Sequence, residues 1–496
     1  ASCVDRILRQ DPAGVYGKMS EATRARYRNQ VCRLARKYRI SEQDVAQRVL
    51  ELAAQGQGNM RHVGWYLFRM PLGAHKKQPS GTIYVASTLV LTLWIVFSLH
   101  NWILFPVLLL PVSDIAKNVV DFWSVRIVPP REIPRMALKN GIPREGRTLC
   151  VIAGLLTGEK SGEEYANLLE QYHLSNRDCG KELRFGLLAD LPDRGTPMGA
   201  KEHQWVRAAE KAVSALNEKY GTGFYLFFRQ PIFHQKDERY VGWERKRGAL
   251  LELTRLLRGK PTSLRILVGK SDELLDTKYV ITLDSDTSLN VGIARKLVGA
   301  MLHPLNRPQV SGDKIVTEGY GLLQPRVAVD LMAANRSQFS RIFAGQGGID
   351  PYGGACSDVY HDLFNRGTYT GKGIFDVEVY LECLDGRFPQ GRILSHDLIE
   401  GAYLHAGLLE DAELSDGYPY QVTSYFTRLH RWIRGDWQLL PWLCLHVKNE
   451  KGEQVANPIS AVDKWKIFDN LRRSLSPIFT LAALLLGMCH SGPVFG

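Results

Sequence analysis

Apolar and polar positions divide the chain into segments of different character. Residues 1–78 are polar and basic, and apolar residues at helical spacing in SEATRARYRNQVCRLARKY predict a solvated helical region, with a membrane-surface or regulatory role as the alternative. The uncharged run 83–99 is at the short end of the roughly 17–25 residues that cross a bilayer as a helix. A second apolar run, 102–112, follows. We expect a transmembrane hairpin over 79–125; the alternatives are a re-entrant second helix and two buried helices of a soluble core.

From residue 126 to residue 445 the pattern alternates between strand and helix. Apolar runs predict strands at 148–156, 183–191, 223–228, 278–284 and 321–327, and helical spacing predicts helices between them, the first opened by a capping box at Ser161. This order predicts an α/β domain with a Rossmann-like, mostly parallel sheet. Such sheets bind ligands beyond the carboxyl ends of their strands, where Asp190 and Asp284 fall.

The end of the chain is again suited to a membrane. Within 446–475, the basic and aromatic stretch 463–475 predicts an amphipathic helix at a membrane surface, and 476–496 predicts the start of another span. Basic residues flank the hairpin on both sides, which predicts that both flanks lie in the cytoplasm. The sequence starts without Met and stops after an apolar run, so we expect a piece of a longer chain.

Composition narrows the class of protein. With 496 residues, 45% hydrophobic and 23% charged, the chain is too long for one core and too ordinary for a disordered chain, a fibre or a pure membrane bundle. A net charge of +12 favours an anionic partner. The eight cysteines include no Cys-x-x-Cys pair, so neither a thiolate zinc site nor a redox motif is indicated. We find no motif of aromatic and basic residues of the kind that is typical of nucleic-acid-binding domains.

Two carboxylates, Asp284 and Asp286, follow the strand 278–284. Hard oxygen ligands of this kind suit Mg²⁺ or Mn²⁺, which bind substrate phosphates and could stabilise a diphosphate leaving group. A capping and turn pair is the alternative.

A further carboxylate, Asp397, lies in the sequence SHDLIEG. An ionised aspartate can act as a general base toward an acceptor hydroxyl. A helix cap or a structural ion pair are the alternatives, and His396 is expected to be a structural histidine rather than a metal neighbour.

The segment 428–437 holds arginines at positions 428, 431 and 434, which can form one basic helix face for phosphate binding. Trp432 and Trp437 could stack on a sugar ring, but packing in a core is the favoured interpretation.

Taken in order, these motifs resemble the processive inverting family-2-like glycosyltransferases, such as cellulose and hyaluronan synthases. The stretches DPAGVYGKMSEATRARYRNQV, GGIDPYGGACSDVYHDLFNRGTYTGKGIFDV, RILSHDLIEG and HRWIRGDWQLLPWL are similar to the cyclic β-1,2-glucan synthase family, over nearly the whole chain. Members of that family are much longer and carry further modules. The resemblance implies a glycosyltransferase-A fold, an enzyme of the bacterial cytoplasmic (inner) membrane whose catalytic domain faces the cytoplasm, UDP-glucose as donor and a growing β-1,2-glucan as product.

On the donor side, the resemblance implies roles for five residues. Asp190 would contact the uridine, and Lys246 or Arg247 the donor. Asp284 would touch the nucleotide sugar, and Asp286 would hold the metal.

On the acceptor side, Asp397 would be the base and Arg431 would steady the diphosphate. Trp432, with Arg428 and Trp437, would form the acceptor site. Arg428 stands where cellulose synthases have Gln.

The family also holds the growing glucan on a protein hydroxyl. Tyr352 is the candidate for this self-priming, Tyr360 and Tyr369 compete with it, and a structural role is favoured for each.

Two rival interpretations remain. VITLDSDTSL nearly matches the haloacid-dehalogenase signature, in which Asp284 would be a phosphatase or phosphotransferase nucleophile, but Ser288 stands where that motif has Thr or Val. The other rival is a catalytically inactive membrane scaffold.

Overall fold

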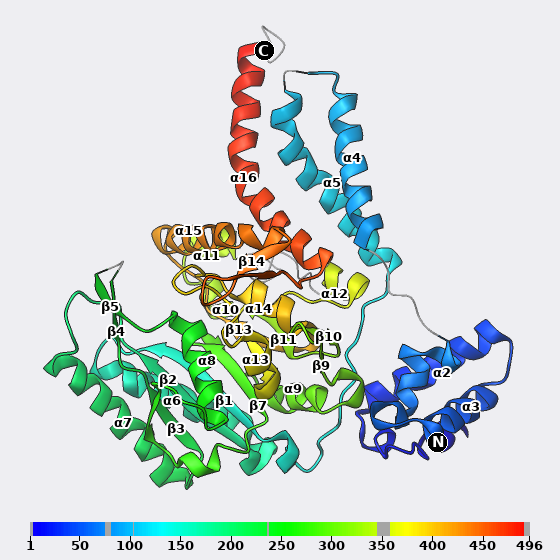
Figure 1. Cartoon of the computed structure of the whole chain (residues 1–496), viewed down its shortest axis with the longest axis horizontal. Helices are drawn as coiled ribbons and strands as arrows, with labels where there is room; N and C mark the ends of the chain where they lie inside the picture. Colours follow the sequence, from blue (N-terminus) through cyan, green and yellow to red (C-terminus); the bar gives the residue numbers. More distant parts are fainter. Residues whose placement is uncertain (1–2, 75–80, 103, 236–237, 345–357, 491–496) are drawn as a thin grey trace.

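The computed structural model describes residues 3–74, 81–102, 104–235, 238–344 and 358–490 (Figure 1). Within them, nine strands form one sheet in the order β6-β3-β2-β1-β7-β12-β11-β13-β8. Their bounds in that order are Arg265–Val268, Phe224–Phe228, Leu183–Asp190, Thr148–Leu155, Tyr279–Asp284, Gly373–Asp376, Leu322–Val329, Gly407–Asp416 and Thr287–Ser288. The predicted strands are therefore confirmed.

The sheet combines a parallel half with an inserted antiparallel strand. β3, β2, β1 and β7 run parallel, so they end at a common carboxyl edge. β12 is antiparallel to both β7 and β11, and β11 is parallel to β13. The α/β class and the Rossmann-like parallel arrangement are confirmed for the first half, whereas the complete sheet is mixed.

Helices cover both faces of this sheet. Alternate residues of β1 face opposite cores: Cys150 and Ile152 pack under α6 (Glu159–Ser175), α7 (Ala200–Tyr220) and α9 (Ile293–Met301). Leu149 and Val151 pack under α8 (Arg245–Leu257), α13 (Val377–Leu384) and α14 (Asp397–Leu404). This alternation follows from the two-residue period of a strand and produces three layers.

The start of α6 differs from the prediction. Its N-cap is Gly158, and Ser161 lies one turn inside, where its Oγ accepts the backbone N–H of Thr157 at 3.2 Å. Ser161 therefore caps the helix start from the third helical position, and not as the N-cap residue itself.

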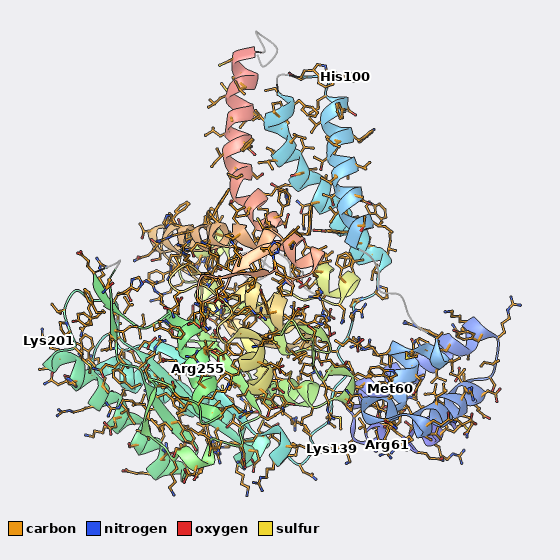
Figure 2. The ribbon with its side chains drawn as sticks, in the orientation of Figure 1. Met60, Arg61, His100, Lys139, Lys201 and Arg255 are labelled. Atoms are coloured by element: carbon orange, nitrogen blue, oxygen red, sulfur yellow. The ribbon has the colours of Figure 1, made fainter. Side chains whose placement is uncertain are left out.

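The N-terminal region is helical, as predicted, with α1 (Cys3–Leu8), α2 (Glu21–Tyr38) and α3 (Glu42–Gln55). It packs against the α/β body, because Leu305 belongs to its core and Tyr27 Oη lies 3.3 Å from His303 Nε2. Figure 2 labels Met60 and Arg61 in this region and Lys139 on the neighbouring body.

Three helices rise together from the body: α4 (Gly81–Ser98), α5 (Phe105–Ile127) and α16 (Ala461–His490) (Figure 1). His100 marks the far end of the α4–α5 hairpin (Figure 2). Among the described residues, α4 and α16 are long and apolar enough to cross a membrane by length and composition, and only 22% and 17% of their apolar windows are buried. Two buried helices of a soluble core, the alternative for the hairpin, would leave less of α4 exposed.

The helix α5 is more polar than α4. It contains Pro111, and Lys117 Nζ donates to Asp121 Oδ2 at 2.6 Å. The part of α5 that holds these polar residues packs at the foot of the three helices. There Arg472 of α16 pairs with Asp114 at 2.5 Å.

The stretch 463–475, predicted as an amphipathic helix, is helical and is joined directly to the predicted span. This stretch is the first half of α16, which continues without a break. Lys466 is 1% exposed and its Nζ donates to the carbonyls of Arg366 at 2.7 Å and Gly367 at 2.8 Å. Lys466 therefore binds the body, whereas an interfacial helix would direct its basic side chains to water and lipid headgroups.

The remaining α-helices and strands lie outside the nine-stranded sheet and the helices named above. They are α10 (Leu331–Ala334), α11 (Gln338–Phe343), α12 (Val359–Phe364), α15 (Val422–Gln438) and the hairpins β4–β5 (Ile232–His234, Arg239–Val241), β9–β10 (Gln309–Val310, Val316–Glu318) and β14–β15 (His446–Lys448, Gln454–Ala456). The seven cysteines that the structure describes form no disulfide.

Candidate active site at the carboxyl edge

The carboxylate of Asp284 ends β7 and is held by two lysines. Lys246 Nζ, from the first turn of α8, donates to Asp284 Oδ1 at 2.6 Å, and Lys372 Nζ lies 3.1 Å from Asp284 Oδ2. Burial favours the neutral acid, but the two ammonium groups outweigh it and hold the pKa of Asp284 well below its usual range. Asp284 is therefore ionised at neutral pH.

Lys372 connects β7 to the end of β13. Its Nζ also donates to Asp416 Oδ2 at 2.6 Å, and Asp416 Oδ1 accepts the hydroxyl of Thr287 at 2.6 Å. Lys372 and Asp416 are both buried. Two carboxylates share this ammonium group, so the ends of β7 and β13 are fixed relative to each other.

Asp286 lies beside this pair and is exposed. Partial desolvation and the nearby charge of Asp416 raise its pKa, while Lys372 and Arg428 act in the opposite direction. Its backbone carbonyl accepts the N–H of Gly417 at 2.9 Å. Among the described residues its carboxylate makes no ion pair, so its oxygens are open to a ligand.

Asp397 is the first residue of α14, and its side chain is 31% exposed. Gly371 lies between Asp397 and the Asp284 cluster. Its carbonyl accepts a hydrogen bond from Lys246 Nζ at 2.7 Å. A Cβ atom at Gly371 would lie 3.0 Å from Asp397 Oδ1. The structure therefore brings Asp284 and Asp397, 113 positions apart, to one edge of the sheet.

His396 separates Asp397 from a buried glutamate. Its Nδ1 lies 3.5 Å from Asp397 Oδ1 and 2.9 Å from Glu400 Oε2. One possible metal-ligand atom from each of the three residues lies within 4.8 Å of the other two. Because His396 and Glu400 pair with each other, we assign no metal to this group.

The helix α15 carries the arginines and tryptophans of the third motif. The guanidinium of Arg428 lies 4.7 Å from the centre of the Trp432 ring. Trp432 and Trp437 are 39% and 40% exposed, so their interpretation as core residues is wrong. Arg431 is exposed on the same helix.

The helix α15 packs closely on the loop before Asp397. A Cβ atom at Gly435 would lie 2.3 Å from Ser395 Cβ, and Gln438 Oε1 accepts the N–H of Leu394 at 2.7 Å. A side chain at position 435 would separate the two segments, so this glycine permits the approach.

Two predicted donor residues lie outside the cluster. Arg229 forms a two-pronged ion pair with Asp190, with its Nε 2.9 Å from Asp190 Oδ1, and it also donates to the carbonyls of Trp243 and Arg245. Arg247 is buried, pairs with Glu244 at 2.7 Å and lies over the ring of Phe388. Of the Lys246 and Arg247 pair, the structure brings only Lys246 to the acidic cluster.

The self-priming candidates have different outcomes. Tyr352 lies outside the described residues. Tyr360 and Tyr369 are 1% and 2% exposed, and Trp465 Nε1 donates to the Tyr360 hydroxyl at 3.1 Å. Their burial agrees with the structural role favoured for them.

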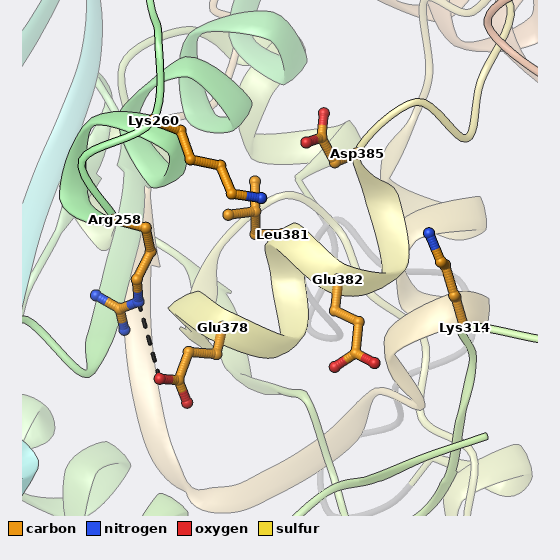
Figure 3. A pocket seen from close by; sticks show the side chains of 7 residues that line it. All are labelled: Arg258, Lys260, Lys314, Glu378, Leu381, Glu382 and Asp385. Carbon is orange, nitrogen blue, oxygen red and sulfur yellow. Dashed lines mark ion pairs between the residues drawn. The ribbon is translucent and has the colours of Figure 1, made fainter. Parts of the chain in front are cut away.

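Two cavities lie elsewhere. One of about 410 Å³ is lined by Arg258, Lys260, Lys314, Glu378, Leu381, Glu382 and Asp385 (Figure 3). The other, of about 620 Å³, lies at the opposite strand ends, between Arg147 and Phe224. Neither includes a residue of the acidic cluster.

The sequence analysis missed Lys372, Asp416, Glu400 and Arg229. Each is a charged residue that is at most 5% exposed. Lys372 stands between glycines directly before an apolar strand, a signal for a loop lysine at a strand end, whereas Asp416 and Arg229 carry no local signal of their partners.

Together, a three-layer α/β fold and a carboxylate–lysine cluster at its carboxyl edge define a protein whose polar centre lies where such folds bind ligands. The chain is 37% identical over 392 residues to the cyclic beta-(1,2)-glucan synthase NdvB of Rhizobium meliloti (strain 1021), and it belongs to that family. The match covers 77% of this chain and 13% of the relative, so the chain spans a small part of the relative's length. No protein-family model matches the chain. Membership in this family does not favour the haloacid-dehalogenase alternative for Asp284.

Proposed function

We propose that this chain is an inverting glycosyltransferase of the glycosyltransferase-A fold, which transfers glucose from UDP-glucose to a growing β-1,2-glucan. The observation that carries the proposal is the position of Asp284 and Asp397 on either side of one short segment: Lys246 binds both Asp284 and the Gly371 carbonyl, and Asp397 lies against Gly371. The relative is named a cyclic beta-(1,2)-glucan synthase, which agrees with sugar transfer at this centre.

In this reaction, Asp397 accepts the proton of the acceptor hydroxyl while the hydroxyl oxygen attacks the anomeric carbon of glucose. The bond from that carbon to the diphosphate breaks on the opposite face, and UDP leaves with the electron pair. Attack opposite the leaving group converts the α-linked donor into a β-linkage. A carboxylate that is partly exposed at the cluster is suited to this proton transfer.

The cations of the site suit a diphosphate. Asp284 forms ion pairs with two ammonium groups, those of Lys246 and Lys372. The helix α15 adds the guanidinium groups of Arg428 and Arg431. Positive charge of this kind stabilises the leaving group as its charge develops. Arg247 has no contact with this group, so we assign the donor contact to Lys246. Asp190 would act on the uridine side together with its partner Arg229.

Asp286 fits a divalent cation, Mg²⁺ or Mn²⁺, because its carboxylate is exposed while both oxygens of Asp284 are held by lysines. Such an ion would neutralise the diphosphate charge. We expect Asp286→Ala to weaken donor binding in the presence of the metal by about tenfold or more and to leave metal-free binding unchanged, as measured by calorimetric titration with and without a chelator. Equal affinity of the two proteins with metal would contradict this assignment.

The acceptor would lie along α15. Exposed Trp432 and Trp437 offer ring faces to a sugar, and Arg428 orders the Trp432 ring by stacking. Tyr352 is our candidate for self-priming on sequence grounds.

We further propose that α4 and α16 anchor the protein in the bacterial inner membrane, with the catalytic domain in the cytoplasm and further modules of a longer chain beyond it. The exposed apolar surface of both helices supports the bilayer as a partner.

The test is incubation of the purified chain with labelled UDP-glucose, UDP-galactose and UDP-N-acetylglucosamine, followed by linkage analysis. We expect label from UDP-glucose alone in 2-linked glucan, and label on the denatured polypeptide if it primes itself. Transfer of another sugar, or a different linkage, would contradict the proposed donor or product.

A further inference from the structure

His396 and Glu400 form a buried, charged support directly behind Asp397. Glu400 is 1% exposed, and its Oε1 accepts the Tyr380 hydroxyl at 3.0 Å, while its Oε2 lies 2.9 Å from His396 Nδ1. A buried carboxylate requires a partner, and the imidazole is the only cationic group paired with Glu400 among the described residues. His396 thus stands between two acids.

The residues around Asp397 come from several elements. Lys246 of α8 and Asp284 of β7 interact with it from the donor side, and Tyr369 faces it from the loop before Lys372. His396 and Glu400 act from its own helix turn. Of these groups, only His396 and Lys246 bring positive charge to Asp397.

We propose that His396, kept as an imidazolium by Glu400, is a positioning residue that holds Asp397 ionised and oriented for proton abstraction. This inference rests on the proposed function, in which Asp397 is the base. It gives the histidine in the SHD motif a role in setting the pH range of sugar transfer.

The opposing charges agree with this role. Burial lowers the pKa of His396, but Glu400 and Asp397 outweigh burial and raise it above its usual value, so both acids favour the charged ring. Burial raises the pKa of Asp397, as do the charges of Glu400 and Asp284, and His396 and Lys246 limit that rise. Removal of the imidazolium should therefore raise the pKa of Asp397 further, because less positive charge then offsets the effect of burial.

The first experiment is the pH dependence of kcat/KM for glucose transfer by the full chain and by His396→Asn. The acidic limb of this pH profile reports the pKa of Asp397. Because the variant loses one adjacent positive charge, we expect the limb to move to higher pH by about one unit or more, with activity recovering at alkaline pH. A purely structural role would lower activity equally at every pH, and an unmoved limb would overturn the proposal.

Two further variants keep this test decisive. His405→Asn removes a buried histidine at the other end of α14, where the left-handed backbone (φ 52°) tolerates Asn, and it should leave the limb in place. If His396→Asn does not fold, His396→Asn with Glu400→Gln replaces the pair by neutral amides. The limb of this double variant should also move upward, because the nearer imidazolium acts on Asp397 more strongly than Glu400 does.

The second experiment does not require activity. In protein labelled with [¹³Cε1]histidine, the signal lost in His396→Asn identifies His396, and its titration reports the charge of the ring. We expect this ring to stay protonated above pH 7 and to lose its proton at lower pH in Glu400→Gln. A ring that is neutral at pH 7 would overturn the inference, whereas a protonated ring in a chain that transfers no glucose would contradict the proposed function alone.

Discussion

At the scale of single residues, the centre depends on which charged atoms touch. Both oxygens of Asp284 are occupied by ammonium groups, so this carboxylate orders Lys246 and Lys372 more directly than it could hold an ion. Asp397 is paired with the imidazole of His396 at 3.5 Å, and its side chain is 31% exposed. This difference assigns electrostatic support to Asp284 and proton transfer to Asp397.

Replacement of the base separates chemistry from binding. Asp397→Asn keeps the shape of the side chain but removes its basicity, so we expect transfer to fall by about 100-fold or more. Affinity for UDP-glucose should stay within about twofold, because the donor contacts come from other residues. Transfer rates and calorimetric titration of the same preparation check both expectations, and a near wild-type rate would show that another group is the base.

Gly371 offers a separate test of the geometry around the base. Its φ is +88°, and a Cβ would lie 3.0 Å and 3.1 Å from the two carboxylate oxygens of Asp397. Gly371→Ala should cost about 1 kcal/mol in backbone strain and should also displace Asp397, lowering the transfer rate.

Gly386→Ala is the matched control for Gly371→Ala. It has a similar φ of +70°, but its Cβ would meet only Glu450 Oε2, at 3.6 Å. Thermal unfolding should show a comparable loss of stability in both variants, and transfer should fall only in Gly371→Ala. Equal activities would mean that contact with Asp397 is unimportant.

At the scale of elements, the sequence predicted what depends on local periodicity. The apolar run KYVITLD appears as β7 and LRFGLLAD as β2, because buried parallel strands are continuous apolar segments. The pairing of Lys372 with Asp416 could not be predicted, since it joins residues 44 positions apart through the order of β12, β11 and β13. Asp190 shows the same limit: its place at a strand end was predicted, but its partner Arg229 was not.

The contact of α15 with the loop before Asp397 gives a prediction for a whole element. Gly435→Ala should favour an isolated helix by about 1 kcal/mol. Here the new methyl group would overlap Ser395 Cβ, at 2.3 Å, and force α15 away from the loop. We expect lower transfer, measured at saturating donor, while Gly487→Ala in α16, with no atom within 4 Å of its Cβ, leaves transfer unchanged. Full activity of Gly435→Ala would show that α15 does not position the base.

At the scale of the whole molecule, charge and burial separate two environments. The α/β body and the foot of α16 contain buried ion pairs, such as Arg366 with Asp463 at 2.8 Å, whereas α4 and the outer half of α16 expose apolar side chains. The sequence predicted apolar helices here because their runs are uncharged. In 463–475 it did not predict that Lys466, one of the basic residues that suggested a lipid surface, binds backbone carbonyls of the body.

Buried neutral histidines make the body sensitive to acid. Burial lowers the pKa of His361 and of His405 to about 3, with Arg131 and Arg366 acting in the same direction. In the unfolded chain both have ordinary values near pH 6.5, so between about pH 6.5 and pH 3 the unfolded state binds more protons. Each histidine therefore contributes stability above that range and loses about 1.4 kcal/mol per pH unit as the pH falls through it.

The contribution of His405 can be isolated by comparing variants. Glu410, whose pKa burial raises to about 8, has the opposite pH dependence, so the slope of wild-type stability alone does not identify the histidines. His405 Nε2 lies 2.7 Å from the Asn365 carbonyl, and His405→Asn removes its titration. We expect this variant to be less stable at pH 7.5 but to lose about 1.4 kcal/mol less per unit between pH 6 and pH 5 than wild type, measured by denaturant unfolding. The exposed His446→Asn should match wild type, and an identical acid loss in His405→Asn would show that the buried imidazole accepts its proton without unfolding.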